Sequence, residues 1–288
     1  MITDEYKAFA KVNLFLEILG RRDDGYHNIK SLFARVDIYD SLKISINEKS
    51  LGISLEVINK SNAFNIANTN NLVYRAADMF MREFDIKSGV SITLTKNIPL
   101  GAGLGGGSSD CGMTLAALSD IFKIKDYKRV FDIGASLGSD VPFFLKNTSF
   151  ACCEGRGEIV TPLDIKAFLP SVLVVFPSVS ISTKEVYQSM DHQYTPKTDL
   201  FDMFVSELME EKMVDFSRYL FNRLEATTFN ISKEVGQLKE LLLSEGLFSL
   251  MSGSGSSIFA ISYDYQKLKK IYEKLLESFD FVFLTKFV

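Results

Sequence analysis

The residues best suited to binding a charged ligand lie in a glycine-rich stretch, PLGAGLGGGSS, over residues 99–109. Glycine lets the backbone adopt positive φ angles and approach a ligand closely, so that consecutive amide groups can converge on an anion. The hydroxyls of Ser108 and Ser109 can add hydrogen-bond donors or an oxygen ligand for Mg²⁺. If one of these serines opens the next helix, the helix N-terminus adds to the attraction. The stretch therefore predicts a phosphate-binding loop.

Three other interpretations of this stretch are weaker. A Walker A loop ends in Gly-Lys-Ser/Thr, whereas Gly107 is followed by Ser108. The glycines also fit the dinucleotide-binding pattern G-x-G-x-x-G, but Asp120, at nearly the required spacing, falls where a helix and not a strand is expected. A purely structural turn is disfavoured because five glycines in seven residues are costly to order.

Two further segments carry polar residues beside apolar ones. In AFAKVNLFL, over residues 8–16, strand alternation places Lys11 and Asn13 on one face. Lys11 has apolar neighbours on both sides, so we expect it to have a structural or catalytic partner. Near the C-terminus, SGSGSS over residues 252–257 separates two apolar stretches and by itself predicts only a turn.

The pattern of apolar residues predicts the elements that must position these segments. Alternation with a period of two predicts strands over residues 42–46, 51–57 and 90–94. A single apolar stripe predicts a helix over 71–84, and further helices are expected after the glycine-rich stretch and before Gly138. The chain is expected to return to strands after Phe150, including residues 172–176. Strands and helices in blocks favour an α+β fold over a doubly wound α/β sheet.

The last third is expected to be largely helical from residue 195 to Gly246, which is placed to cap a helix C-terminus. The tail then predicts a strand, a Gly/Ser turn, a strand, a helix and a strand. The boundary between two domains is expected near residues 150–175.

Composition excludes several classes of protein. The chain has 288 residues, 47% hydrophobic and 24% charged, and a net charge of −4, as in an ordinary globular protein without a nucleic-acid surface. No apolar run is long enough to span a bilayer, and residues 1–5 do not resemble a signal peptide. The three cysteines fit neither a disulfide framework nor zinc-ligand spacing. We therefore expect a cytoplasmic protein without membrane or nucleic-acid partners.

The glycine-rich stretch closely resembles the central motif of the GHMP kinases, which include galactokinase, homoserine kinase and mevalonate kinase. Residues 8–16 and 252–257 resemble the first and third motifs of that family, in the same order along the chain. The resemblance implies a two-lobed α+β fold. Residues 1–160 would form an N-terminal ribosomal-protein-S5-like lobe that binds ATP, and residues 161–288 a C-terminal ferredoxin-like α/β lobe.

The family resemblance also implies ATP and Mg²⁺ as cofactors, with the glycine-rich loop around the triphosphate. The implied ATP-binding residues of the loop are Pro99, Gly101, Gly103, Gly105, Gly106, Gly107, Ser108 and Ser109. The positions implied around the adenine are Asn71, Leu72 and Lys96. The residues that would ligate Mg²⁺ are left open.

Three segments resemble one branch of that family, which acts on 4-diphosphocytidyl-2-C-methyl-D-erythritol in the non-mevalonate route to isoprenoids. They are GRRDDGYH (20–27), LGSDVPFF (137–144) and PSVSIST (177–183). The Asp-Gly pair in the first segment predicts a tight turn that presents the following Tyr and His. The branch resemblance implies that the cytosine stacks between Tyr26 and Tyr187 and is hydrogen-bonded by His27, while Asn13 and Thr183 hold the rest of the substrate.

The same resemblance implies the reacting groups. Asp140 is expected to accept the proton of the substrate hydroxyl, and Lys11 is expected beside it, orienting the acid and lowering the pKa of the alcohol. Asp110 departs from the family, in which a neutral Asn often follows the serines. We interpret it as a carboxylate that caps the next helix, because acids are stabilised at helix N-termini.

Two alternatives remain for the function. One is another GHMP kinase, acting on homoserine, a mevalonate derivative or a sugar. The other is a catalytically silent relative that binds a nucleotide and senses a metabolite, which would need neither Lys11 nor Asp140. The oligomeric state is open between a monomer and a weak homodimer.

Overall fold

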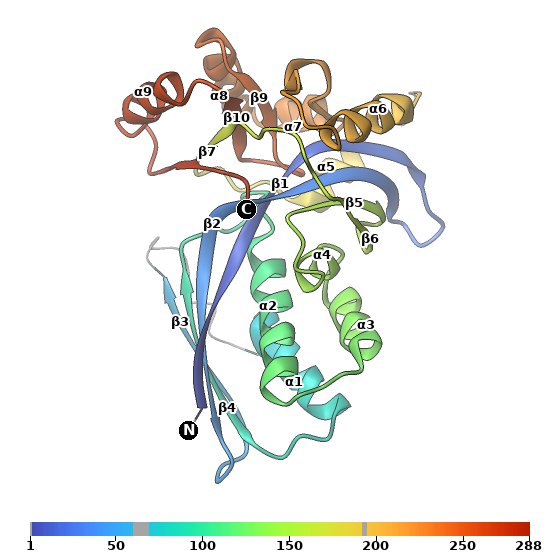
Figure 1. Ribbon diagram of the computed structural model, residues 1–288, viewed down its shortest axis with the longest axis vertical. Helices are drawn as coiled ribbons and strands as arrows, with labels where there is room; N and C mark the ends of the chain where they lie inside the picture. The colour runs from blue at the N-terminus through green and yellow to red at the C-terminus, as the bar shows by residue number, and fades with distance from the viewer. Residues whose placement is uncertain (1, 60–68, 192–194) are drawn as a thin grey trace. The chain divides into compact units, whose positions relative to one another are not determined.

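The structure is a computed structural model that describes residues 2–59, 69–191 and 195–288 (Figure 1). The chain forms two compact units built from interleaved segments. Unit 1 comprises Met1–Ala10, Ile38–Leu100 and Gly105–Asn147, and unit 2 comprises Lys11–Asp37, Gly101–Leu104 and Thr148–Val288. Neither unit is contiguous in the sequence, so these units do not correspond to lobes divided at one position. The expected division into residues 1–160 and 161–288 stays a prediction.

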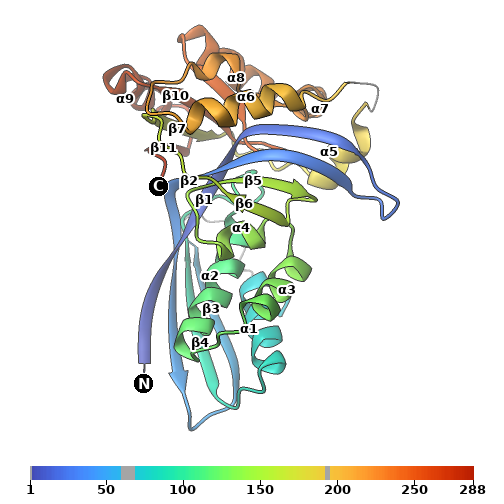
Figure 2. The ribbon, with the colours of Figure 1, turned by 45° about the vertical axis from the view of Figure 1, so that its right-hand side comes forward.

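Unit 1 is a sheet with helices on one face (Figures 1 and 2). Its strands follow the order β3-β4-β2-β1, with β1 (Ile2–Arg21) and β2 (His27–Asn47) each continuing into unit 2. β2 is antiparallel to β4 (Gly89–Lys96), whereas β3 (Gly52–Asn59) is parallel to β4. The helices are α1 (Leu72–Glu83), α2 (Gly106–Ile121), α3 (Tyr127–Leu137) and α4 (Val141–Leu145).

Helix α1 forms where its apolar stripe and N-cap predict it. The side chain of Asn71 accepts a hydrogen bond from the amide of Val73 at 2.9 Å, which satisfies one of the unpaired donors of the first turn. Val73, Ala77 and Phe80 of this stripe are buried in a core that α1 shares with α2, α3 and the strands. Burial of this stripe positions the strand β4 and the glycine-rich loop that follows it.

Unit 2 contains two groups of paired strands. In the first, β5 (Phe150–Gly155) is antiparallel to β2 and to β6 (Ile159–Pro162), and β8 (Phe221–Asn222) is parallel to β1. The second is an antiparallel sheet in the order β11-β7-β10-β9. Its strands are β7 (Ser171–Phe176), β9 (Phe248–Met251), β10 (Ile258–Ser262) and β11 (Phe281–Thr285).

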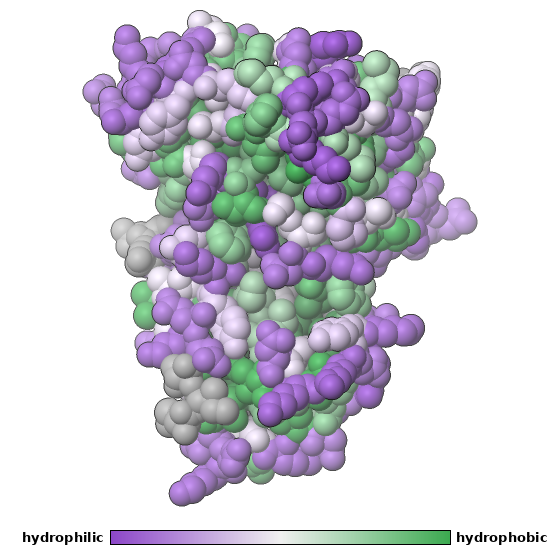
Figure 3. All heavy atoms as spheres, viewed as in Figure 1, coloured by the Kyte–Doolittle hydropathy of each residue, from purple (hydrophilic) through white to green (hydrophobic). Residues whose placement is uncertain are grey.

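Helices α8 (Lys233–Ser244) and α9 (Tyr265–Leu275) pack against the second sheet. Leu268, Ile271 and Leu275 of α9 are buried in the core of unit 2, and hydrophilic side chains cover the outer side of this helix (Figure 3). The remaining helices are α5 (Thr183–Ser189), α6 (Thr198–Leu208), α7 (Glu225–Ile231) and a 3₁₀ turn at Phe216–Arg218. Within the described part of the chain, no helix is long and apolar enough to cross a membrane.

Most of the expected elements are confirmed. β2, β3, β4, α1, α2 and α3 lie where the periodicity predicts them, and the tail has the expected order from β9 to β11. Gly246, with φ of +70°, follows the end of α8 and closes it through a hydrogen bond from its amide to the Leu243 carbonyl at 2.8 Å. The parallel pairing of β3 with β4 was not foreseen, because periodicity defines a strand and not its partner.

Candidate active site

Lys11 is a buried cation on β1, with 4% of its surface exposed. Its ammonium donates a hydrogen bond to Asn13 Oδ1 at 2.8 Å and another to the Gly103 carbonyl at 3.1 Å. It also lies 4.9 Å from the centre of the Phe33 ring. The first bond confirms that Lys11 and Asn13 share a face of the strand.

A chain of hydrogen bonds fixes the orientation of Asn13. Its Nδ2 donates to Ser31 Oγ at 2.9 Å, and the Ser31 hydroxyl donates to the Phe15 carbonyl at 2.5 Å. Because the amide nitrogen is used in this way, the amide oxygen faces the Lys11 ammonium. Lys11 is thus held by a side chain that is itself held by its neighbouring strand.

The second and third motifs interlock in unit 2. Gly103, with φ of +74°, passes so close to the third motif that a Cβ there would lie 2.2 Å from the Ser252 carbonyl oxygen. The Ser252 hydroxyl donates to the Gly103 carbonyl at 2.9 Å. A Cβ on Gly253, which has φ of +59°, would lie 3.4 Å from the Lys11 ammonium. Parts of all three sequence motifs therefore meet at Lys11.

The rest of the glycine-rich loop forms the start of α2 in unit 1. The helix begins at Gly106 with Gly105 as its N-cap in the left-handed region, so the expectation that Ser108 or Ser109 opens it is corrected by two to three residues. Because glycine has no Cβ, Gly105 adopts this left-handed conformation without steric strain, and the helix can start before the two serines. The first-turn amides have no acceptor within the helix and point to its N-terminal side, where an anion is stabilised.

Lys96, expected near the adenine, lies between two carboxylates in unit 1. Lys96 is 4% exposed, and its ammonium donates to Asp110 Oδ2 at 2.7 Å and forms a short ion pair with Asp40. The other oxygen of Asp40 accepts the amides of Asn97 at 2.5 Å and Ile98 at 2.8 Å. The trio therefore connects the end of β4, where the glycine-rich loop starts, to α2, where the loop ends.

The interpretation of Asp110 as a helix cap is wrong. Asp110 is the fifth residue of α2, is buried, and bonds Lys96 instead of a first-turn amide. Burial raises the pKa of this carboxyl to about 8, against the opposing effect of Lys96. Burial dominates because a carboxylate removed from water favours its neutral form, and the nearby Asp40 carboxylate adds to the rise.

Asp140 precedes α4 at the surface of unit 1, half-buried, and accepts a hydrogen bond from the Ser139 hydroxyl at 3.3 Å. Lys11 belongs to unit 2, so the expected pairing of these two residues stays a prediction. Asn71 and Leu72, the other residues expected at the adenine, are the N-cap and first residue of α1 in unit 1.

The predicted turn before Tyr26 is present. The Gly25 amide donates to the Arg22 carbonyl at 3.1 Å, and Gly25 has φ of +84°. Tyr26 is 56% exposed after this turn, and the Arg156 guanidinium lies 5.0 Å from the centre of its ring. A partly exposed ring of this kind can stack on a nucleobase.

The other residues expected to bind substrate also lie in unit 2. His27 is buried, and its ring centre lies 5.1 Å from that of Tyr187 on α5. The Thr183 hydroxyl, at the start of α5, is 2.8 Å from the Ser254 hydroxyl of the third motif. Tyr187 therefore contacts His27, and Thr183 contacts the third motif, which in turn contacts Lys11.

Sequence reasoning missed three residues that contact the predicted residues or their motifs, one in unit 1 and two in unit 2. Asp40 organises Lys96, Arg156 lies over Tyr26, and Asn222 holds the third motif through two backbone carbonyls. Asp40 could be suspected because it is a carboxylate at the end of an alternating apolar stretch. Asn222 and Arg156 give no local signal, since their partners are distant in the sequence.

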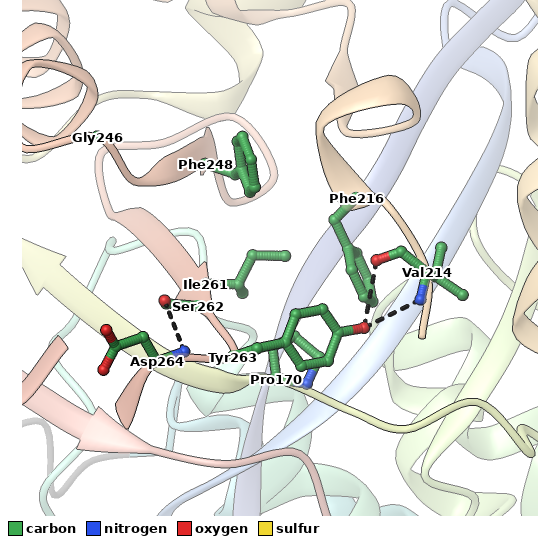
Figure 4. A pocket seen from close by; sticks show the side chains of 9 residues that line it. All are labelled: Pro170, Val214, Phe216, Gly246, Phe248, Ile261, Ser262, Tyr263 and Asp264. Carbon is green, nitrogen blue, oxygen red and sulfur yellow. Dashed lines mark hydrogen bonds between the residues drawn. The ribbon is translucent and has the colours of Figure 1, made fainter. Parts of the chain in front are cut away.

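A separate hollow of about 230 Å³ lies elsewhere in unit 2 (Figure 4). None of the predicted site residues lines it. Its polar groups already have partners in the protein: the Tyr263 hydroxyl bonds Val214 and Phe168, the Ser262 hydroxyl accepts the Asp264 amide, and Asp264 caps α9. This apolar hollow therefore does not have the converging groups of an active site.

The first turn of α2 offers groups that suit the phosphates of a nucleotide. Among the described residues, no three His, Cys, Asp or Glu side chains gather in a way that could hold a metal ion. Mg²⁺ in phosphoryl-transfer sites is usually held by one or two carboxylates, waters and the phosphates of the nucleotide. The first turn of α2, with its serines and unpaired amides, fits a nucleotide that brings the metal with it.

Comparison with known proteins places this geometry in a family. The GHMP kinases N terminal domain matches residues 71–147, and the GHMP kinases C terminal domain matches residues 204–280. A 4-diphosphocytidyl-2-C-methyl-D-erythritol kinase from Clostridium kluyveri is 38% identical over 285 residues, covering 98% of this chain and 99% of its own.

Solved structures agree. The crystal structure of a 4-(cytidine 5'-diphospho)-2C-methyl-D-erythritol kinase is 30% identical, with a TM-score of 0.81 over 99% of this chain and 100% of its own. The homoserine kinase from Cytophaga hutchinsonii, at 18% identity, shares the fold with a TM-score of 0.70 over 99% of this chain and 95% of that one.

The loop at the start of α2 and the match to both domains define the class, and the chain is a GHMP kinase, an ATP-dependent small-molecule kinase. Its similarity to the Clostridium kluyveri enzyme over nearly the whole of both chains goes further. Within that class, the chain belongs to the family of the 4-diphosphocytidyl-2-C-methyl-D-erythritol kinases.

Proposed function

We propose that this protein transfers the γ-phosphoryl group of Mg·ATP to the 2-hydroxyl of 4-diphosphocytidyl-2-C-methyl-D-erythritol, a step of the non-mevalonate route to isoprenoid precursors. The relative with 38% identity supports the substrate, because it carries that name and matches 98% of this chain. The protein would act in the cytoplasm on small molecules, as a monomer or weak homodimer, without nucleic-acid or membrane partners.

One structural observation carries the proposal. The buried ammonium of Lys11 donates to the carbonyl of Gly103 and packs against Gly253, so residues of the three family motifs gather around one cation. Hydrogen bonds to Asn13 Oδ1 and to the Gly103 carbonyl fix the position of this buried positive charge. This arrangement suits a cation that works on a negatively charged ligand.

The chemistry assigned to the side chains follows from phosphoryl transfer, which depends on positioning and on neutralising charge. Asp140 accepts the proton of the substrate hydroxyl, and Lys11 favours the developing negative charge on that oxygen. The glycine-rich loop binds the triphosphate through its backbone amides. Mg²⁺, when bound with ATP, neutralises charge on the transferred group. Asn71, Leu72 and Lys96 are assigned to the adenine end.

Recognition of the cytidine end falls to residues of unit 2. Tyr26 and Tyr187 are proposed to stack on the cytosine, His27 to hydrogen-bond it, and Asn13 and Thr183 to hold the rest of the substrate. The exposure of Tyr26 and the contact between the His27 and Tyr187 rings support these roles. A homoserine or mevalonate kinase has no need of a nucleobase platform.

The test is ADP release by the purified protein with Mg·ATP and each of three acceptors: the cytidine substrate, homoserine and mevalonate. Turnover is expected with the cytidine substrate alone. Turnover only with homoserine or mevalonate would keep the kinase class and reject the roles of Tyr26, His27 and Tyr187. Folded protein that binds ATP but turns over none of the three would instead favour a nucleotide-binding sensor.

A further inference from the structure

We propose that Asn222 is a positioning residue for Lys11: it holds the third glycine-rich motif in the conformation that fixes the Lys11 ammonium. Asn222 ends β8 in unit 2 and is 5% exposed. It touches neither the glycine-rich loop nor Lys11 in any described contact, and it lies 211 positions from Lys11 in the sequence. The inference rests on the function proposed above, in which Lys11 acts on the reacting oxygen.

The amide of Asn222 is fully engaged by backbone groups. Its Nδ2 donates to the Met251 carbonyl at 2.8 Å and to the Gly253 carbonyl at 2.8 Å, so both of its N–H groups are used. Its Oδ1 accepts the Leu224 amide at 2.9 Å. The two carbonyls flank Ser252, so Asn222 clamps the backbone on both sides of that residue.

A second contact reinforces the clamp. The Glu225 carboxylate accepts the Met251 amide at 2.9 Å and forms an ion pair with Lys239 at 2.5 Å. Met251 is therefore held at its carbonyl by Asn222 and at its amide by Glu225. The backbone entering the third motif is fixed before it reaches Lys11.

The clamped residues are those that contact the Lys11 site. The Ser252 hydroxyl donates to the Gly103 carbonyl, the same oxygen that accepts the Lys11 ammonium. Gly253 lies directly over that ammonium, since a Cβ built on it would be 3.4 Å from the nitrogen and 3.6 Å from Asn13 Oδ1. A shift of the Met251–Gly253 backbone would move the Ser252 hydroxyl that holds the Gly103 carbonyl, the acceptor of the Lys11 ammonium. It would also move the Gly253 backbone that lies over this ammonium.

The physical consequence is a loss of positioning more than a loss of binding. Removing the Asn222 amide leaves two carbonyls to find other donors, and water can satisfy them without fixing their position. In phosphoryl transfer, a misplacement of about 1 Å can lower the rate by about 100-fold. We therefore expect Asn222→Ala to lower kcat by about 10- to 100-fold, with KM for ATP nearly unchanged.

The test is a double-mutant cycle with Asn222→Ala, Lys11→Ala and the double variant, measured by ADP release on the cytidine substrate. If Asn222 acts through Lys11, its substitution lowers kcat in the wild-type background and has no further effect once Lys11 is absent. Equal losses of kcat in both backgrounds, or a wild-type kcat for Asn222→Ala, would overturn the proposal.

Thr228→Val is the matched control. Thr228 is buried in the same unit, and its hydroxyl donates at 3.3 Å to the carbonyl of Ser254, one residue beyond the clamp. Its kcat should stay near that of wild type, and a loss equal to that of Asn222→Ala would assign the effect to general loosening of the loop. Should Asn222→Ala not fold, Asn222→Asp keeps the acceptor for Leu224 and loses the donors, and the same cycle applies.

A second readout needs no substrate. Reductive methylation followed by mass spectrometry of peptides should label Lys11 faster in Asn222→Ala than in wild type. Lys96, equally buried in unit 1, is the internal control and should be unchanged. Unchanged Lys11 labelling would reject the positioning role. Faster labelling in a protein that turns over no cytidine substrate would keep the positioning role and reject the proposed function.

Discussion

At the scale of single residues, the Gly103 carbonyl is the point where the site is assembled. It accepts both the Lys11 ammonium and the Ser252 hydroxyl, and the absence of a side chain on Gly103 lets the third motif approach. The shared face of Lys11 and Asn13 could be predicted from strand alternation. Their contact with residues about 90 and 240 positions away could not, since alternation describes one strand only.

Asp140→Asn tests the assignment of the proton acceptor. An amide cannot take the hydroxyl proton, so kcat should fall by about 10²- to 10⁴-fold, while KM for either substrate changes little. Steady-state kinetics measure both, with Asp132→Asn as the control because that carboxylate is exposed on α3. A wild-type kcat for Asp140→Asn would remove Asp140 from this role.

Tyr26→Ala tests the nucleobase platform. Base–aromatic stacking contributes about 1–3 kcal/mol, so KM for the cytidine substrate should rise by about 5- to 150-fold and KM for ATP should not. Tyr127→Ala is the matched control, since that ring is also exposed but lies on α3. Equal KM values for Tyr26→Ala and wild type would place the cytosine elsewhere.

At the scale of elements, the two ends of the glycine-rich loop are connected through charge. β4 supplies Lys96 before the loop, and α2 supplies Asp110 after it. The sequence predicted both elements but assigned Asp110 to the helix terminus, because the helix start was placed too late. The carboxylate of Asp40, from β2, completes the trio, and its partnership depends on the pairing of β2 with β4.

Asp110→Asn tests the charge balance of this trio. Because burial raises the pKa of Asp110 to about 8, the folded protein holds a proton that the unfolded chain releases above pH about 4. The stability that this proton contributes is therefore lost as pH rises from about 4 to about 8. An Asn has no such dependence. When pH is raised from 5 to 7, the free energy of unfolding of wild type should therefore fall by about 1–3 kcal/mol relative to that of Asp110→Asn.

Urea denaturation at the two pH values measures this difference. The comparison between the variant and wild type cancels the titration of groups that do not interact with Asp110, and the difference reports the titration of the trio of Asp110, Lys96 and Asp40. A constant difference in the free energy of unfolding between pH 5 and pH 7 would show that the carboxyl of Asp110 has an ordinary pKa.

At the scale of the whole molecule, the α+β class and the order of the three motifs could be predicted, because both are encoded in local patterns. The interleaving of the two units could not. β1 and β2 each cross from one unit to the other within a continuous strand, and no glycine or proline stands at either crossing to mark it. β8 has two residues, too few for any periodicity, and yet it carries Asn222.

The identity of the phosphorylated oxygen tests the central claim most directly. In a 2-C-methyl-erythritol, carbon 2 carries a methyl group and no hydrogen, whereas the carbons of the other hydroxyls carry hydrogens. Proton-coupled ³¹P NMR of the product formed with Mg·ATP should therefore show a new phosphate monoester without splitting by a proton on the ester carbon. A monoester split by such a proton, or no new monoester at all, would contradict transfer to the 2-hydroxyl.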